Sequence, residues 1–218
     1  MGFCGVCDML SFVMTENAQG LTDIGKLVLT FAKVNRATFH EDGKRSESDT
    51  DHTVMLSISA CALAQKLYPG TLDIGLIAQF ALVHDLVEVY AEDTDSFGLK
   101  EEAKKEKEKR EWEAFLRIKE EFGMVYPWLP ETIERYEELD TKEARFVKML
   151  DKLMPKVTHV LNDGIIFKTR GETRAYMTEF YASQQQEAEE TWGKDFPEVT
   201  QLLEEIVGEV MRRVHGEA

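Results

Sequence analysis

Apolar residues recur every three or four positions along most of the chain, which is the spacing of helices that bury one face. The stretches with this spacing are residues 17–34, a helix opened by His52, residues 72–91, a short helix from Glu131, and residues 144–153, 172–190 and 197–214. The stretch 72–91 is apolar on most faces, as expected of a central buried helix. Residues 35–50 are polar and include a glycine, and they predict a loop. Because no convincing strand pair and no internal repeat is recognisable, the predicted fold class is all-α.

Two local signals add detail to this pattern. Asp140 and Glu143 have the spacing of a capping box ahead of the helix over residues 144–153. Residues 100–113 are almost entirely charged, with Glu101 and Lys105 in the favourable i, i+4 order, which predicts a solvated helix. The simplest interpretation of that helix is a surface face without a function of its own.

Composition describes one globular domain. The chain has 218 residues, 43% hydrophobic and 31% charged, with five prolines spread along it and no linker-like stretch. We expect an N-terminal extension over residues 1–16 and a single domain over residues 17–218, with the C-terminal helices packed on it. No apolar stretch of about 18 residues was evident, so no membrane span is expected.

The net charge of −15 argues against a general basic surface for long nucleic acid. A small anionic substrate would need local cations, namely a metal ion, Arg or Lys. The cysteines are Cys4, Cys7 and Cys61, and no second Cys pair completes a structural zinc site with Cys4 and Cys7. The start of the chain lacks the basic residues of a secretory signal, so a reducing cytoplasmic location is expected.

An unusual group of ionisable residues interrupts the apolar stretch 72–91. His84 and Asp85 are adjacent, Glu88 follows one helical turn later, and Asp93 lies just beyond. Burying such groups among Leu and Val is costly unless they pair or bind a metal ion. Helical spacing would place His84 and Glu88 on one face.

Two other residues supply the further ligands of a metal site. His52 begins an apolar helix, and Asp151 lies beside Leu150 near the buried side of another. Together with His84 and Asp85 they make a mixed nitrogen and oxygen ligand set from three helices. Such a set suits a divalent ion of Mn, Fe, Co, Zn or Mg, and ligand type alone does not separate these metals.

The order of His52, His84-Asp85 and Asp151 resembles the H…HD…D pattern of the HD-domain metal-dependent phosphohydrolases. The similarity is greater to the YfbR-type 5′-deoxynucleotidases, through Asn35-Arg36 before the Asp51-His52 loop and through the segment 143–153. It covers about residues 20–165 and implies an HD-domain helical bundle.

The resemblance also implies roles for individual residues. His52, His84, Asp85 and Asp151 would hold one divalent ion, and Glu88 would orient or deprotonate the attacking water. Asp93 would contact the sugar 3′-hydroxyl or, with Glu88, help to bind a second metal ion. Arg36 would bind the phosphate. Lys33 and Lys148 are weaker candidates for additional positive charge, and each also fits a surface lysine.

Two residues depart from the family's pattern. The bacterial deoxynucleotidases carry a Trp after the arginine, which screens against a ribose 2′-hydroxyl, and this chain has Ala37 there. The usual Gly before the aspartate is replaced by Glu92. Ala37 leaves the preference for deoxyribose open, and Glu92 adds charge close to the metal site.

Three functions follow as hypotheses. The first is a cytoplasmic 5′-nucleotidase that acts on (deoxy)nucleoside 5′-monophosphates and, like its family, forms a homodimer. The second is an HD phosphohydrolase for nucleoside triphosphates or the alarmone (p)ppGpp, although Val89 after Glu88 departs from the alarmone hydrolases. The third is a non-enzymatic helical module with a structural metal ion, which would need neither Glu88 nor Arg36.

Overall fold

Helices account for nearly all the regular structure of the computed structural model, which describes residues 14–95 and 99–216. Cys4, Cys7 and most of the expected N-terminal extension lie outside the described residues. The elements are α1 (Glu16–Phe31), β1 (Asn35–Phe39), β2 (Ser46–Ser48), α2 (Asp49–Leu67), α3 (Ile74–Val83), α4 (Glu88–Ala91), α5 (Glu101–Phe122), α6 (Trp128–Glu137), α7 (Lys142–Leu161), α8 (Ile165–Arg170), α9 (Arg174–Ala188), the π-helix η1 (Glu189–Gly193) and α10 (Pro197–His215). The predicted all-α class is confirmed.

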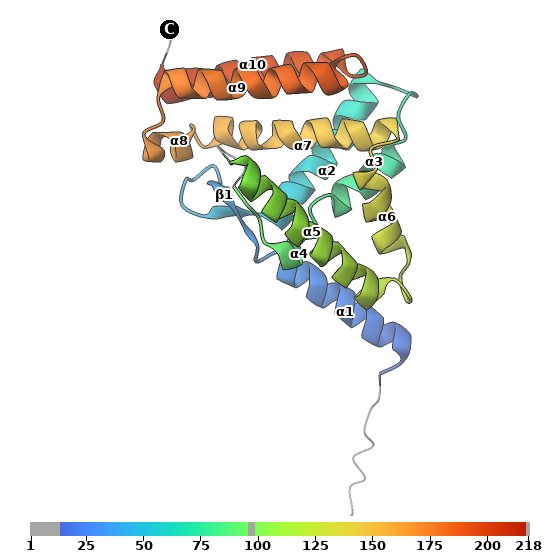
Figure 1. The fold of residues 1–218 in the computed structure, drawn as a ribbon. Helices are drawn as coiled ribbons and strands as arrows, with labels where there is room; N and C mark the ends of the chain where they lie inside the picture. The colour runs from blue at the N-terminus through green and yellow to red at the C-terminus, as the bar shows by residue number, and fades with distance from the viewer. Residues whose placement is uncertain (1–13, 96–98, 217–218) are drawn as a thin grey trace, which may run out of the picture.

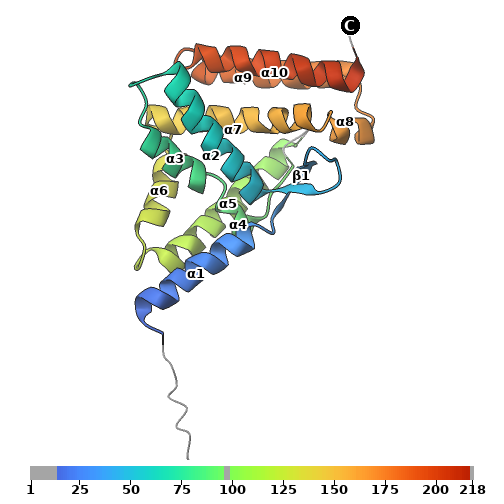
Figure 2. The same ribbon diagram turned by 180° about the vertical axis from the view of Figure 1, so that it is seen from behind.

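Helix α7 runs through the middle of the molecule (Figure 1). The antiparallel pair α9 and α10 covers one side of it, and α1, α4 and α5 lie toward the other. Seen from behind, α2 and α3 cross α7 (Figure 2). Helix α7 therefore contacts both the N-terminal and the C-terminal halves of the chain.

Apolar side chains form two large clusters that meet close to the end of α3. The first joins α2, α3, α7 and α10 through residues such as Leu56, Phe80 and Leu150. The second joins α1, α4, α5 and α6 and includes Val83, the last residue of α3. His84 follows Val83 directly, so the ionisable stretch lies at the junction of the two clusters.

The prediction of one continuous helix over residues 72–91 is wrong. Helix α3 ends at Val83, residues 84–87 form a tight turn, and α4 restarts at Glu88. Within the turn, the N–H of Leu86 donates to the carbonyl of Val83 and that of Glu88 to the carbonyl of Asp85, which are i→i−3 bonds. Because the turn has i→i−3 bonds, the i, i+4 spacing of an α-helix does not relate His84 to Glu88.

The prediction of an irregular loop over residues 35–50 is also wrong, because β1 and β2 form an antiparallel hairpin there (Figure 1). Asn35 pairs with Ser48 and Phe39 with Ser46, with an irregular register between them. The short polar strands lack the apolar alternation that identifies a strand in a sequence. The hairpin leads directly into α2, which begins at Asp49, before the expected start at His52.

Two expected helix starts also differ from the structure. Thr141 caps α7 by accepting a hydrogen bond from the N–H of Ala144, and Glu143 instead accepts one from the N–H of Asp73, so the predicted capping box is absent. Helix α6 begins at Trp128 instead of Glu131. Pro130 lies in the first turn of α6, where a proline is tolerated because its missing N–H would have no partner there.

The charged segment is confirmed as a helix, and it continues as α5 to Phe122. Its first half is mostly exposed, whereas Phe115, Ile118 and Phe122 bury the second half. Glu101 forms its ion pair with Lys104 at i, i+3, and not with Lys105 at i, i+4 as predicted.

One stretch has the length and apolar composition of a membrane span. The window Ile74–Ala91 has a mean hydropathy of 1.4, although no such stretch was expected from the sequence. More than half of it is buried inside the fold, and the turn at residues 84–87 interrupts it. These features identify it as part of the protein core.

Candidate metal centre

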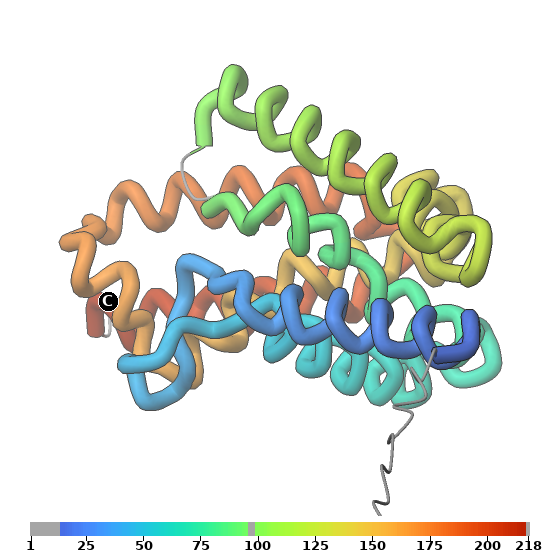
Figure 3. The backbone as a smooth tube through the Cα atoms, turned by 90° about the horizontal axis from the view of Figure 1, so that it is seen from below, coloured from blue at the N-terminus to red at the C-terminus, as the bar shows by residue number. Residues whose placement is uncertain are grey.

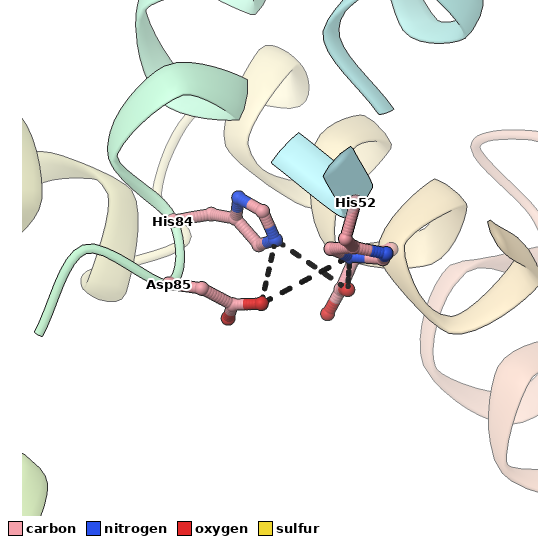
Figure 4. A group of neighbouring side chains, drawn as sticks. His52, His84 and Asp85 are labelled. Atoms are coloured by element: carbon pink, nitrogen blue, oxygen red, sulfur yellow. Dashed lines mark hydrogen bonds and ion pairs between the residues drawn. The ribbon is translucent and has the colours of Figure 1, made fainter. Parts of the chain in front are cut away.

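Four side chains from three parts of the chain converge on one point (Figure 4). Nε2 of His52 lies 3.0 Å from Oδ1 of Asp151, and Nε2 of His84 lies 3.0 Å from Oδ2 of Asp85. The remaining cross-distances are 3.6 Å from His84 to Asp151 and 3.9 Å from His52 to Asp85. The structure thus brings together all four metal ligands predicted from the sequence.

Local structure explains how His52 and His84 are presented. Ser48 and Asp51 form a reciprocal capping box that fixes the first turn of α2, and His52 follows in that turn. His84 lies at the end of α3, where its Nδ1–H donates to the carbonyl oxygen of Ala81 at 2.9 Å. That bond keeps the proton on Nδ1 and leaves Nε2 free to bind a metal ion.

The carboxylate of a buried glutamate lies behind His52, within ion-pairing distance of its ring. Oε1 of Glu47, on β2, lies 3.4 Å from Nδ1 of His52. The carboxylate also accepts a hydrogen bond from the hydroxyl of Thr158 on α7 at 2.8 Å. A carboxylate behind a metal-binding histidine fixes the ring orientation and raises the basicity of the ligand. Sequence reasoning missed Glu47, since a polar residue in an expected loop carries no sign of burial.

The pKa values of the cluster indicate that its carboxylates stabilise positive charge between them. Burial lowers the pKa of His84, but Asp85 and Asp151 raise it more, to about 10. Burial raises the pKa of Asp151, whereas His52 and His84 hold it well below its usual range. The imidazole protons thus balance the carboxylates in the protein alone, and a divalent cation would replace them on binding. The buried donor set of two imidazoles and two carboxylates fits a divalent metal ion.

Arg36 joins the metal ligands to a second group of carboxylates. Its Nη1 lies 2.9 Å from Oδ2 of Asp85 and 3.2 Å from Oδ1 of Asp49. Asp49 is completely buried, and burial, followed by the opposing effect of Arg36, leaves its pKa raised to about 6. Sequence reasoning did not identify Asp49, because it belongs to the polar segment 35–50 that was expected to be a loop.

Glu88 lies beside this group and is almost fully buried. Burial, together with the charges of Asp85, Asp93 and Asp49, raises the pKa of Glu88 to about 10. Its Oε1 lies 3.5 Å from Nζ of Lys107 on α5. The charged segment at the start of α5 is therefore more than a surface face, because it supplies a cation to the site.

Glu88 lies close to Asp49 and Asp85, whereas the sequence resemblance paired it with Asp93. Glu88, Asp49 and Asp85 each offer an oxygen within 4.8 Å of the others, which is a second group able to hold a metal ion. Asp93 is not a member of that group, although it lines the same cavity. Burial raises the pKa of Asp93, and the neighbouring Arg36 opposes that rise.

Glu92 has an unusual backbone conformation, with φ of 62° and ψ of 145°. Few residues other than glycine adopt this region. The difference from the family's pattern at this position thus places a strained residue directly before Asp93.

His84, Asp85 and Asp151 line a cavity of about 1200 Å³, whereas His52 is buried behind them. The cavity is bounded by β1, α5, α7 and α9, which Figure 3 shows from below around the short helix α4. Arg36, Asp93 and Lys148 all line it, as does Ala37. Lys33 does not line it and is exposed, which fits the interpretation of Lys33 as a surface lysine.

Comparison with known proteins agrees with this geometry. Residues 30–195 match the model of a family described as HD domain. A predicted metal-dependent phosphohydrolase from Magnetospirillum magnetotacticum MS-1 has a similar crystal structure, with 25% identity and a TM-score of 0.67 over 89% of this chain and 95% of that chain. No curated protein matches the chain.

Two archaeal structures share the fold. A conserved hypothetical protein from Pyrococcus furiosus is 23% identical, with a TM-score of 0.56, and the matched region covers 88% of this chain and 99% of that chain. The PH0347 protein from Pyrococcus horikoshii OT3 is 22% identical, with a TM-score of 0.55 and the same coverage.

Proposed function

The chain belongs to the HD-domain family, and from this membership and its metal centre we propose that it hydrolyses the phosphate ester of (deoxy)nucleoside 5′-monophosphates. The coarser part of this function, a metal-dependent phosphohydrolase, agrees with the description of the similar protein from Magnetospirillum magnetotacticum. The choice of a 5′-nucleotide as substrate extends the sequence resemblance to the YfbR-type enzymes.

One observation carries the proposal, which is that three of the four candidate metal ligands, His84, Asp85 and Asp151, line a large cavity instead of being enclosed. A structural metal site is closed by protein ligands, whereas a catalytic site keeps positions open for water and substrate. Arg36 and Glu88 lie beside the ligands and also line the cavity. A non-enzymatic module would have no use for either residue in that position.

The chemistry follows from the positions of these side chains. A divalent ion held by His52, His84, Asp85 and Asp151 would lower the pKa of water and polarise a phosphate oxygen. Arg36 presents a planar cation suited to the phosphate oxygens, and its bonds to Asp85 and Asp49 hold it in place. A phosphate bound by Arg36 beside the metal ligands would present its phosphorus atom to the attacking water.

We assign Glu88 as the general base that deprotonates the attacking water. Its carboxylate accepts the proton of the water as the new P–O bond forms and the bond to the nucleoside oxygen breaks. The leaving nucleoside oxygen takes up a proton from solvent water and departs as a hydroxyl, and Glu88 returns its own proton to the solvent. Lys107 orients the carboxylate, and a cation bound beside Glu88 would favour its charged form. Asp93 lines the same cavity, and we assign to it the contact with the sugar hydroxyls.

The test measures phosphate release from a panel of nucleoside mono-, di- and triphosphates and (p)ppGpp in Mn²⁺, Co²⁺ and Mg²⁺. We expect turnover of 5′-monophosphates, and Glu88→Gln should keep the bound metal but lose about 10²-fold or more in kcat. The control Glu102→Gln changes an exposed glutamate at the start of α5 and should have the wild-type rate. Unchanged turnover in Glu88→Gln would remove Glu88 from the mechanism, and release only from triphosphates or (p)ppGpp would favour the second hypothesis.

A homodimer in the cytoplasm completes the proposal. The C-terminal helices α9 and α10 pack on each other, and α10 also packs on α7. Large exposed apolar residues on α1 and α2, namely Leu21, Val28, Leu29, Val54 and Ile58, offer surface for a second copy of the chain. Light scattering on a size-exclusion column measures the oligomeric state, and a monomeric mass would refute the homodimer.

A further inference from the structure

The cavity extends well beyond the metal ligands along α7. One face of this helix lines it over three turns, through Lys148, Asp151, Lys152, Pro155, Lys156 and His159. At a rise of 1.5 Å per residue, His159 lies about 12 Å along the helix axis from the metal ligand Asp151. The cavity is therefore longer than a single phosphate bound at the metal requires.

Lys156 is a buried cation in that extension. It is only 6% exposed, and its Nζ donates a hydrogen bond to the backbone carbonyl of Lys152. Among the residues that the structure describes, no carboxylate lies within ion-pairing distance of Lys156. Burial lowers its pKa to about 8, as expected of an ammonium group without a counter-ion.

Two other cations that line this extension are already paired. Lys152 forms an ion pair with Glu187 of α9, and Arg170 forms one with Asp95. Lys156 differs from these two in having no anionic partner within the described part of the chain.

Tyr181 on α9 lines the cavity close to Lys156. Nζ of Lys156 lies 5.8 Å from the ring centroid of Tyr181, which is 4% exposed. The hydroxyl of Tyr181 is buried and has no hydrogen-bond partner within residues 14–95 and 99–216. A buried hydroxyl without a partner costs free energy, and a bound anion can accept the hydrogen bond that it offers.

We propose that Lys156 and Tyr181 form a second anion subsite, which holds a phosphoryl group of the substrate other than the one that is hydrolysed at the metal. Lys156 supplies the charge, and the Tyr181 hydroxyl donates a hydrogen bond. The inference rests on the proposed function, and it adds a second phosphoryl group to the phosphate that is hydrolysed. The second group is joined to the first in a chain or carried on another sugar oxygen.

The experiment compares three forms of one nucleoside, its 5′-monophosphate, its 5′-diphosphate and its 3′,5′-bisphosphate, by phosphate release. Wild-type protein should have a kcat/KM for one doubly phosphorylated form that exceeds that of the monophosphate by about tenfold to a hundredfold, the usual worth of a charged hydrogen bond. The form preferred distinguishes a phosphate chain from two separate phosphates. Equal values for all three would overturn the proposal.

Tyr181→Phe and Lys156→Met identify the residues responsible. Each variant keeps the apolar part of the side chain. Each should lower kcat/KM for the preferred doubly phosphorylated nucleotide, relative to kcat/KM for the monophosphate, by about tenfold. Tyr176→Phe is the matched control on the same helix, because Tyr176 is 40% exposed and does not line the cavity. It should keep the wild-type ratio.

Two results would contradict the subsite. If Lys156→Met lowers kcat/KM for all three nucleotides by the same factor, Lys156 binds the reacting phosphate. If Tyr181→Phe changes the melting temperature but not the ratio, its hydroxyl has only a structural role.

A calorimetric titration separates this inference from the proposed function. The 3′,5′-bisphosphate is titrated into wild-type protein and into Tyr181→Phe, with no turnover required. Weaker binding by the variant supports the subsite even if no nucleotide is hydrolysed, whereas equal binding by both proteins refutes it.

Discussion

Removal of the Glu47 carboxylate should weaken metal binding although Glu47 does not contact the metal. Glu47 is 3% exposed, and it connects Nδ1 of His52, 3.4 Å away, to the hydroxyl of Thr158. Without it, the His52 ring loses the partner that fixes its orientation. Loss of such a contact typically costs 10- to 100-fold in metal affinity, or about 1.4 to 2.7 kcal/mol.

Three variants separate charge, contact and packing. Glu47→Ala removes the contact and should lose affinity over the whole of that range. Glu47→Gln keeps an oxygen that can accept from Nδ1 of His52 and should lose less, because only the charge is gone. Thr158→Val removes the other partner of the carboxylate and should bind metal almost as tightly as wild type.

Competition with a chromogenic chelator at constant pH measures the affinity, starting from protein freed of metal by dialysis. Urea unfolding of the same variants controls for stability, since Glu47→Ala leaves the buried Thr158 hydroxyl without its partner, at a cost of about 1 to 3 kcal/mol. If Glu47→Ala binds metal as tightly as wild type, the proposed support of His52 is wrong. If Thr158→Val weakens binding as much as Glu47→Ala, the loss comes from packing and not from the contact with His52.

Three further predictions concern the ligands, the backbone and pH. Asp151→Ala should lose its bound metal, and with it the roughly 2.7 kcal/mol that a ligand at 100 times its Kd contributes to stability; a wild-type metal content would show that Asp151 is not a ligand. Glu92→Gly should raise the free energy of unfolding by about 1 kcal/mol in urea, because it relieves the backbone at φ of 62°, and no gain would mean that Glu92 is not strained. Burial, together with the charge of Lys156, lowers the pKa of His159 from 6.5 to about 4. Between these values the unfolded chain binds a proton that the folded chain does not, so stability should fall as the pH drops from about 6.5 to 4. His159→Phe should flatten the pH dependence of unfolding in that window, and an equally steep curve would contradict the assignment.

The sequence by itself determined the helical class, most of the helices and the four residues of the candidate metal cluster. The apolar stripe of α10 and the buried side of α7 follow from a period of 3.6 residues, which depends only on neighbours in the chain. His52, His84, Asp85 and Asp151 could be identified because ionisable residues among apolar ones are rare unless they pair or bind metal. Residue type and order were sufficient for that inference.

Tertiary structure alone decided which polar residues became buried next to those ligands. Glu47 and Asp49 belong to a segment that is polar throughout, and nothing in its pattern separates them from solvated neighbours. They are buried only because β2 and the start of α2 pack against α7. The end of α3 at Val83 also depends on tertiary packing, since the apolar residues 72–91 by themselves predict a continuous helix.

The extension of the cavity toward Lys156 and Tyr181 was equally beyond the reach of the sequence. These two residues lie on different helices, 25 positions apart (181 − 156), and only the packing of α9 over α7 brings them together. Periodicity reports which face of a helix is buried, but it does not report which helix covers that face. Local pattern therefore determined the elements and the metal-binding residue types, and the long-range contacts between helices decided the shape and charge of the cavity around them.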